Sequence, residues 1–328
     1  MKKMISILLA AMLIFSLTAC ESDGGSDNMG GTADDQKPEK VTVTCLNGSS
    51  ETVEIEVPYD PQRIAVVDFA SLDILDNLGL GDRIVGTSNV TLDYLSSYND
   101  KEGVANLGTI KTADMEAIML CDPDIIFMAG RLSDSYDALS EIAPVVRLTS
   151  DSTLGLVESV RKNAKVIASI FGLEDEIDAK LEAYDGRISA LSAVAKDKNA
   201  LVVMCSGGSF SLLGNDGRCS IIGTEIGFNN IGVSEETATA THGNEASFEY
   251  IVQADPDYMF VMDRDAAIGS DGAQLAKDVM ENDLVKGTDV YKNGHIVYLE
   301  NPGIWYTAEG GITALGIMLS DLESALIK

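Results

Sequence analysis

Hydrophobic and polar positions change their spacing several times along the chain, and this spacing predicts two α/β regions joined by a helical segment. Residues 41–57 alternate polar and apolar side chains around Asn47-Gly48, which indicates a β-hairpin. Beyond Pro61, short apolar runs alternate with stretches of helical spacing. Short buried strands that alternate with helices are typical of a parallel sheet covered on both faces.

The predicted strands and helices fall into an earlier and a later group. The strands are expected at 64–68, 83–86, 124–128 and 145–148, and then at 200–205, 210–213 and 258–262. The helices are expected at 71–78, 114–120, 133–141, 220–226, 248–254 and 308–326. Between the two groups, residues 154–194 keep helical spacing without proline, which predicts one long helix, or two helices with a break near Gly172.

Two segments repeat the same order of residues. Asp122-Pro123-Asp124 precedes one predicted strand and Asp255-Pro256-Asp257 precedes another. Each follows a predicted helix that has a glutamate near its start, Glu116 in the first case and Glu249 in the second. The two groups of elements therefore have the pattern of an internal structural repeat.

The predicted fold is α/β, with two Rossmann-like lobes that contain mainly parallel sheets. The lobes are expected at 41–152 and 197–328, joined by one long interlobe helix within 153–196. In open α/β sheets the ligand binds beyond the carboxyl ends of the strands, which predicts a ligand cleft between the lobes. Because a long helix is stiffer than hinge strands, we expect the lobes to move by only a few degrees on ligand binding.

The first forty residues have the pattern of an export signal followed by a tether. An apolar run that follows Lys2 and Lys3 is too short to span a bilayer as a helix, so residues 1–19 are predicted to be a lipoprotein signal peptide. The run ends at Cys20, whose thiol would receive a diacylglycerol, and 20–40 is expected to be a flexible tether. Two acyl chains, such as palmitate, would anchor the protein to the outer face of the cell membrane. A plain secretory signal is the alternative.

Charge and histidine content exclude two classes of ligand. The chain has 52 acidic and 23 basic residues, a formal net charge of −29, so nucleic acid phosphates would be repelled. Its two histidines, His242 and His295, are too few for a dedicated zinc or manganese site built from several imidazoles.

The remaining cysteines do not form a metal or redox motif. Cys45, Cys121, Cys205 and Cys219 are not arranged as CxxC, and the pattern favours buried thiols. A disulfide between Cys205 and Cys219 stays open as an alternative, because an exported protein can form one.

Three arginines follow predicted strands at the edge where the cleft is expected. Arg131 follows the strand at 124–128, Arg264 follows the strand at 258–262, and Arg218 follows a turn after 210–213. Planar guanidinium groups suit delocalised oxygen anions and aromatic rings, so the pattern indicates a local cationic pocket. Ion pairs with nearby aspartates are the alternative for each arginine.

Further along, His242 lies in a loop before a helix, and Trp305-Tyr306 lies just before the last helix. Taken alone, a single histidine is more often solvated, and a Trp-Tyr pair more often belongs to the core.

Together these residues give the chain a resemblance to a known family. From about residue 60 to the C-terminus it resembles the class III solute-binding lipoproteins of ABC importers, in the branch that binds ferric catecholate siderophores. The most telling stretches are 61–68, Gly130-Arg131, 241–244, 260–269 and Trp305-Tyr306.

The resemblance implies a function in iron transport and a role for each residue. His242 and Tyr306 would be ligands to the siderophore-bound ferric ion. Arg131, Arg218, Arg264 and Trp305 would contact the siderophore. Glu116 and Glu249 would dock on the permease. It further implies a monomer without an intrinsic cofactor, whose partners are a ferric siderophore, the ABC permease and its ATPase.

Two other functions were weighed. A protein of the same fold could bind haem or a corrinoid, with His242 or Tyr306 as axial ligand. An enzyme, such as an esterase that acts on the siderophore, is not expected, because the chain has no Gly-x-Ser-x-Gly elbow and no metallohydrolase histidine pair.

Overall fold

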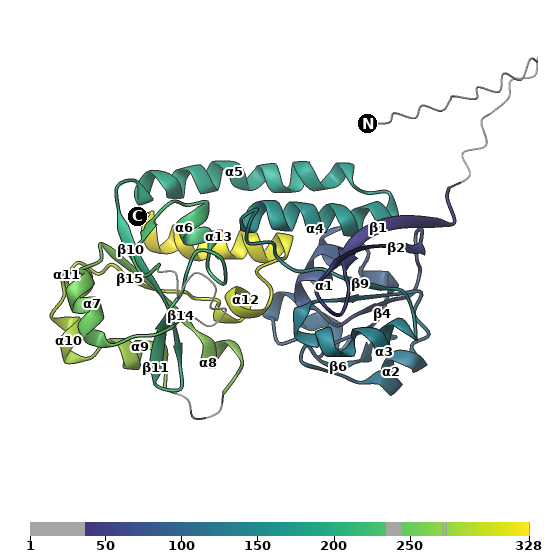
Figure 1. The fold of residues 1–328 in the computed structure, drawn as a ribbon, viewed down its shortest axis with the longest axis horizontal. Coiled ribbons are helices and arrows are strands. Elements are labelled where there is room, and N and C mark those ends of the chain that lie inside the picture. The colour runs from purple at the N-terminus through teal and green to yellow at the C-terminus, as the bar shows by residue number, and fades with distance from the viewer. Residues whose placement is uncertain (1–36, 234–243, 271, 273, 328) are drawn as a thin grey trace, which may run out of the picture. The chain divides into compact units, whose positions relative to one another are not determined.

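The first lobe is built on a sheet whose centre is parallel. The computed structural model describes residues 37–233, 244–270, 272 and 274–327 (Figure 1). Within these residues the first sheet has seven strands in the order β2-β1-β9-β8-β3-β4-β5. Their bounds are β1 Lys40–Leu46, β2 Thr52–Pro58, β3 Ile64–Val66, β4 Ile84–Thr87, β5 Ala105–Asn106, β8 Ile125–Met128 and β9 Val145–Arg147. The antiparallel pairing of β1 with β2 confirms the predicted hairpin.

Short helices cover this sheet, and a small hairpin lies beside it. The helices are α1 Phe69–Asn77, η1 Gly81–Arg83, η2 Asp93–Asn99, α2 Met115–Leu120, η3 Gly130–Ser135 and α3 Tyr136–Ser140, and the hairpin is formed by β6 Gly108–Thr109 and β7 Thr112–Ala113. Asp68 caps α1, since its carboxylate accepts the Ser71 N–H at 2.8 Å. This cap places Asp68 directly after β3, at the carboxyl edge of the sheet.

The second lobe has a mixed sheet. In the described residues its strand order is β13-β11-β10-β14-β15, with β12 also paired to β10. The bounds are β10 Asn199–Ser206, β11 Ser209–Leu212, β12 Asn229–Asn230, β13 Asn244–Glu245, β14 Tyr258–Asp263 and β15 Ile296–Tyr298. Strands β10, β14 and β15 are parallel, and the pairings of β11 are antiparallel. Its helices are α6 Ile221–Thr224, α7 Phe248–Ala254, α8 Arg264–Ala267, α9 Ala276–Met280, α10 Asp283–Lys286, α11 Asp289–Lys292 and α12 Pro302–Thr307.

The segment between the lobes folds as two helices rather than as one long helix. Helix α4 spans Leu156–Phe171, Gly172 ends it in a left-handed conformation, and α5 spans Asp175–Ala195. In Figure 1, α5 extends along both lobes, with α4 beside its first part and α13, Ile312–Leu326, beside its later part. We call α4, α5 and α13 the helical spine. Of the two predicted arrangements, the structure has the pair of helices with a break at Gly172 and not the single interlobe helix, because Gly adopts positive φ without strain.

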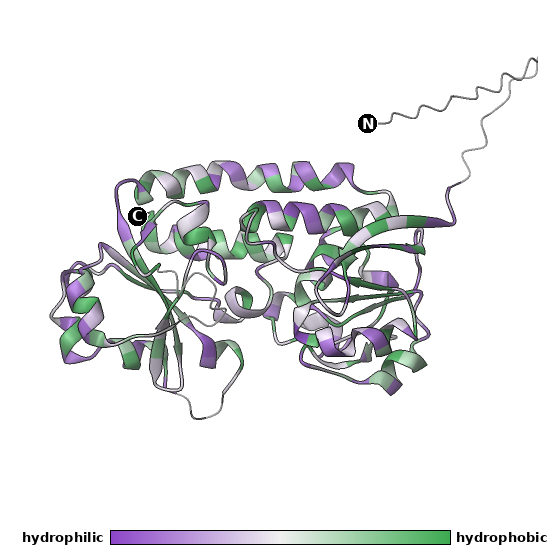
Figure 2. Ribbon diagram, in the orientation of Figure 1, coloured by the Kyte–Doolittle hydropathy of each residue, from purple (hydrophilic) through white to green (hydrophobic). Residues whose placement is uncertain are grey.

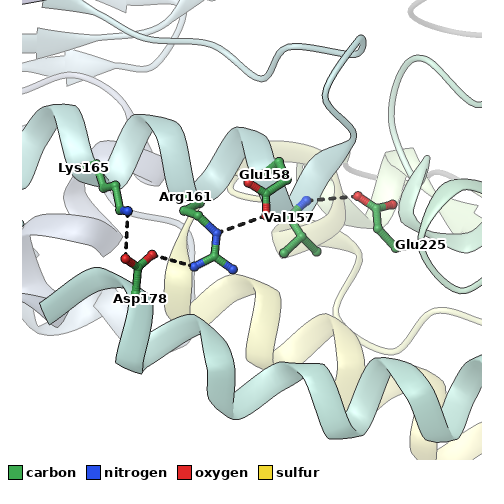
Figure 3. Close-up of polar contacts among 6 residues, drawn as sticks. All are labelled: Val157, Glu158, Arg161, Lys165, Asp178 and Glu225. Atoms are coloured by element: carbon green, nitrogen blue, oxygen red, sulfur yellow. Dashed lines mark hydrogen bonds and ion pairs between the residues drawn. The ribbon is translucent and has the colours of Figure 1, made fainter. Parts of the chain in front are cut away.

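Polar contacts hold the two helices of this pair together (Figure 3). Asp178 on α5 accepts from Arg161 and from Lys165 on α4, each at 2.8 Å, and Arg161 also donates to Glu158 at 3.0 Å. These groups are partly exposed to water, so they orient the helices more than they stabilise them.

Two carboxylates tie the spine to both lobes by capping helix N-termini. Asp73, on α1 of the first lobe, accepts the Thr313 and Ala314 N–H groups of α13, each at 2.9 Å. Glu225, which follows α6 of the second lobe, accepts the Val157 N–H of α4 at 3.0 Å (Figure 3). Neither helix has a side-chain cap of its own, because each follows a glycine. We call these two contacts the reciprocal caps.

Asp73 is enclosed completely. It is 0% exposed, and its carboxylate also accepts the Tyr94 hydroxyl at 2.6 Å. Burial outweighs these hydrogen bonds and raises the pKa of Asp73 to about 6. A Cβ at Gly311 would collide with the Asp73 carboxyl, so the glycine permits the close approach.

A single hydrophobic core joins both lobes to the spine. It includes Ile64 and Phe127 from the first sheet, Phe260 and Met262 from the second, and Leu315 from α13. Figure 2 shows the central strands of both sheets mainly in the hydrophobic colour, while α5 carries both hydrophilic and hydrophobic turns. Two smaller clusters lie on the other faces of the sheets. In the part of the chain that is described, no helix combines the length and apolar character needed to cross a bilayer.

Candidate ligand-binding site

A cleft of about 770 Å³ lies between the lobes. The first lobe contributes Asp68, Arg131 and Thr149 to its lining, and the second contributes Arg218 and Arg264. The remaining wall includes Tyr306 of α12 and Glu309 in the link between α12 and α13. The cleft therefore lies at the carboxyl edge of both sheets, as predicted.

Three arginines converge on Tyr306 in this cleft. Arg131 donates from Nη2 to the Tyr306 carbonyl oxygen at 2.7 Å, and Arg218 donates from Nε to the same oxygen at 3.4 Å. Arg264 donates from Nε to the Tyr306 phenolic oxygen at 3.1 Å. Their guanidinium carbons lie 5.7, 4.3 and 5.6 Å from the ring centroid, respectively. We call these four residues the arginine site.

Local structure explains why these side chains meet. Arg131 lies in η3, which begins just after β8, and Arg264 is the first residue of α8, directly after β14. The carboxyl ends of the two strands therefore aim both arginines at the cleft. Arg218 reaches the same place from the turn after β11, where the next residue, Cys219, has a φ of +60°.

Partners at the site differ between the arginines. Arg264 donates to the Ser206 hydroxyl at 3.0 Å and lies 3.6 Å from Asp265. Burial lowers the pKa of Arg131, and the positive charge of Arg218 lowers it further. Crowding of the two guanidinium groups favours an anion between them.

The cleft as a whole is not cationic. Among its described lining residues, the four basic side chains are matched by four acidic ones: Arg131, Arg218, Arg264 and Lys111 against Asp68, Asp151, Asp216 and Glu309. The positive character that the sequence indicated is confined to the arginine site.

Glu309 is a carboxylate of the cleft lining that interacts electrostatically with Arg218 and Arg131 of that site. It is half-buried and accepts the Cys219 N–H at 3.3 Å. Burial raises the pKa of Glu309 to about 7, although Arg218 and Arg131 oppose the shift. Sequence reasoning missed this residue. The one available signal was a charged side chain three positions after Tyr306, in an otherwise apolar and glycine-rich stretch.

Trp305 does not line the cleft. Its side chain is 0% exposed, and its indole N–H donates to Asp321 at 2.8 Å. This geometry places it behind Tyr306 as part of the core, so it supports the site without facing a ligand.

The other predicted residues lie elsewhere. Glu116 and Glu249 are exposed in the first turns of α2 and α7, on opposite lobes. His242 and Cys20 lie outside the described residues, as does the predicted signal peptide. The four described cysteines are buried and free, so the Cys205–Cys219 disulfide is not formed. Among the described residues, no group of three or more His, Cys, Asp or Glu side chains is placed to hold a metal ion.

Comparison with known proteins identifies the class. Residues 64–302 match the family described as periplasmic binding protein. The petrobactin-binding protein YclQ of Bacillus subtilis is 34% identical over 331 residues, which cover 100% of both chains. The ferric-anguibactin-binding protein FatB of Vibrio anguillarum is 26% identical, with 97% of this chain and 96% of that protein covered.

Solved structures agree with the sequence matches. The crystal structure of YclQ superposes with a TM-score of 0.80, covering 88% of this chain and 100% of that chain. The periplasmic catecholate-siderophore binding protein VctP of Vibrio cholerae is 32% identical and superposes with a TM-score of 0.77, covering 87% of this chain and 100% of that chain. This chain belongs to the periplasmic binding protein family, and its two-lobed α/β fold is the fold of that family.

Proposed function

We propose that this protein is the substrate-binding component of an ABC importer and that it captures a ferric siderophore of the catecholate type. The observation that carries the proposal is the arginine site, whose three arginines reach Tyr306 from three separate segments and line the interlobe cleft with it. The names of YclQ and VctP, which denote petrobactin and catecholate siderophore binding, support the same ligand class.

The chemistry of ferric catecholates fits this arrangement. Ferric ion prefers hard oxygen donors, and a tetradentate bis-catechol leaves two coordination positions open. In our proposal the Tyr306 phenolate and the His242 imidazole fill those positions. A phenolate bound to iron can keep accepting the hydrogen bond from Arg264. Arg131 and Arg218 then offset the negative charge of the catecholate oxygens.

Delivery to the membrane is the second part of the proposal. Glu116 and Glu249 would bind basic residues of the permease, one from each lobe, because both are exposed at matching places in the internal repeat. Cys20 would carry the lipid that keeps the protein at the membrane. The name of one relative, "Probable siderophore-binding lipoprotein YfiY" of Bacillus subtilis, supports this anchor.

Fluorescence titration tests the ligand class. Trp305 is the single tryptophan of the chain and precedes Tyr306, so an iron complex in the cleft should quench its emission. We expect saturable quenching by a ferric bis-catecholate. In a His242→Ala, Tyr306→Phe double variant we expect the saturable quenching to be lost. The matching gallium complex, which lacks the visible charge-transfer band, should bind with little quenching.

Titration with other classes of ligand can contradict the proposal. Saturable quenching by haem, a corrinoid or a ferric hydroxamate, without any by catecholates, would keep a transport role but replace the ligand. A haem complex would also show a sharp Soret band, whereas a ferric catecholate gives a broad visible band.

A further inference from the structure

Glu309 occupies a position in the cleft that the proposed iron coordination does not use. It lies in the short link between α12 and α13, and it lines the same cleft as the arginine site. Its Oε2 atom accepts the Cys219 backbone N–H, which the left-handed conformation of Cys219 turns toward it. An L-residue adopts this conformation at a cost, and the hydrogen bond from its N–H to Glu309 is one contact that stabilises the loop that carries Arg218.

The charges around Glu309 come from three elements. Arg218 lies in the loop packed on it, and Arg131 reaches it from the first lobe. The Cys219 thiol is buried beside it, and the carboxylate raises the pKa of that thiol further. The negative charge of Asp68 also acts on Arg131, but Asp68 Oδ2 already accepts from the Ser71 N–H and hydroxyl as a helix cap.

Glu309 has fewer hydrogen bonds from the protein than a structural carboxylate such as Asp73. Among the described residues it accepts one long bond of 3.3 Å, and because it is only half-buried, water can reach the rest of the carboxylate. Its remaining stabilisation comes from the same two guanidinium groups that a ligand would need. A negatively charged ligand and the Glu309 carboxylate therefore compete for Arg131 and Arg218.

We propose, on the basis of the ferric siderophore function above, that Glu309 limits the negative charge of the complexes that this cleft accepts. When Glu309 is ionised, it partly neutralises the arginine site, but the site still binds a complex of one net negative charge. A complex of three net negative charges is repelled by the carboxylate at short range. Each additional ligand charge then lowers affinity by about threefold to fivefold, for charges separated by about 8 Å at an intermediate dielectric.

The test uses two ferric complexes that share the same iron coordination. A linear bis-catecholamide gives a ferric complex with one net negative charge, and its doubly ring-sulfonated counterpart gives one with three. Affinities of both are measured by Trp305 quenching for the wild type, Glu309→Gln and Glu309→Asp. Glutamine keeps the acceptor for the Cys219 N–H and removes only the charge. Asp134→Asn is the matched control, because Asp134 is exposed in the same segment as Arg131 but does not line the cleft.

At pH 8 we expect Glu309→Gln to reduce the preference for the less charged complex by about tenfold. Glu309→Asp should keep the wild-type preference, and Asp134→Asn should change it by less than about twofold. The wild-type preference should also grow as the pH rises through about 7, where Glu309 ionises, and should stay flat in Glu309→Gln. Because sulfonates do not titrate in this range, a change of the preference with pH would come from a group of the protein.

Two results separate this inference from the proposed function. If the wild type binds both complexes and Glu309→Gln keeps the same preference, or Asp134→Asn shifts it equally, the role of Glu309 is wrong and the ligand class stands. If the wild type binds neither complex, the proposed function is wrong and the inference falls with it.

Discussion

Asp73 on α1, which caps a helix of the spine, and Glu309 in the cleft are both carboxylates with a raised pKa, but their burial and their partners differ. Asp73 accepts two backbone N–H groups and one tyrosine hydroxyl, all within 2.9 Å. Glu309 accepts a single N–H at 3.3 Å and otherwise faces guanidinium groups. The pKa of Asp73 is raised to about 6 and that of Glu309 to about 7.

The difference separates structure from function within one molecule. The two backbone donors of Asp73 belong to α13, which has no side-chain cap of its own, so these hydrogen bonds fix the position of α13 on the first lobe. The partners of Glu309 face open cleft and can be taken over by a ligand. A similarly raised pKa therefore accompanies a structural role for Asp73 and a role in the cleft for Glu309. The number of hydrogen bonds distinguishes the two carboxylates better than the pKa does.

Removal of the Asp73 carboxylate should have the largest effect on stability. Asp73→Ala leaves two helix N–H groups and the Tyr94 hydroxyl without their partner, so we expect the free energy of unfolding to fall by about 3–4 kcal/mol. Urea unfolding followed by circular dichroism measures this. Affinity for a ferric bis-catecholate should change by less than about threefold. A loss of binding without a loss of stability would contradict the division between spine and cleft.

Replacement of the Tyr306 hydroxyl should show the opposite profile. Tyr306→Phe removes one proposed iron ligand and the acceptor for Arg264, so we expect affinity for the ferric bis-catecholate to fall by about 100-fold, or about 2.7 kcal/mol. The free energy of unfolding should change by about 1 kcal/mol or less, since the ring remains in place. Titration and urea unfolding of the same preparation check both values. Unchanged affinity would remove Tyr306 from the coordination sphere.

The pH dependence of stability should distinguish Asp73 from Glu309, although the effect is smaller than those of the two substitutions above. The native pKa of Asp73, about 6, lies above that of the unfolded chain, so the native state holds this proton more tightly. The contribution of this proton to the free energy of unfolding is fully present below about pH 4 and is lost as the pH rises through 6. We expect the wild type to lose about 2 kcal/mol from this source between pH 4 and 7.

Asp73→Asn provides the control for this effect, because asparagine does not titrate. Urea unfolding at several pH values should show the wild type losing stability relative to Asp73→Asn as the pH rises from 4 to 7, with the difference constant above that range. Parallel curves over the whole range would mean that Asp73 keeps an ordinary pKa. Glu309→Gln offers a second comparison with its own transition near 7.

Local sequence patterns predicted the elements that depend on local spacing. The buried strands β8 and β14, each after an Asp-Pro-Asp, were expected at nearly their observed positions. The approach of Arg131 and Arg264 to one cleft followed from the rule for carboxyl ends of parallel strands. Strand β15 was missed, since three residues carry too little periodicity to be recognised.

Contacts between distant residues could not be predicted from spacing. Asp73 and Thr313 are 240 positions apart, and Cys219 and Glu309 are 90 apart. Nothing near Asp73 distinguishes it from an ordinary surface aspartate on a helix. Trp305 was placed beside the ligand because it precedes Tyr306, but on a helix consecutive residues point in different directions.

The shared core and the reciprocal caps have a consequence for how the protein can be assayed. Because one hydrophobic cluster runs through both sheets and the spine, the two halves of the repeat cannot melt independently, and we expect a single cooperative transition. A compound held in the cleft then raises the melting temperature of the whole folded chain in proportion to the logarithm of its concentration. Candidate siderophores can accordingly be ranked by thermal shift with unlabelled protein, including colourless metal complexes that leave no optical signal of their own.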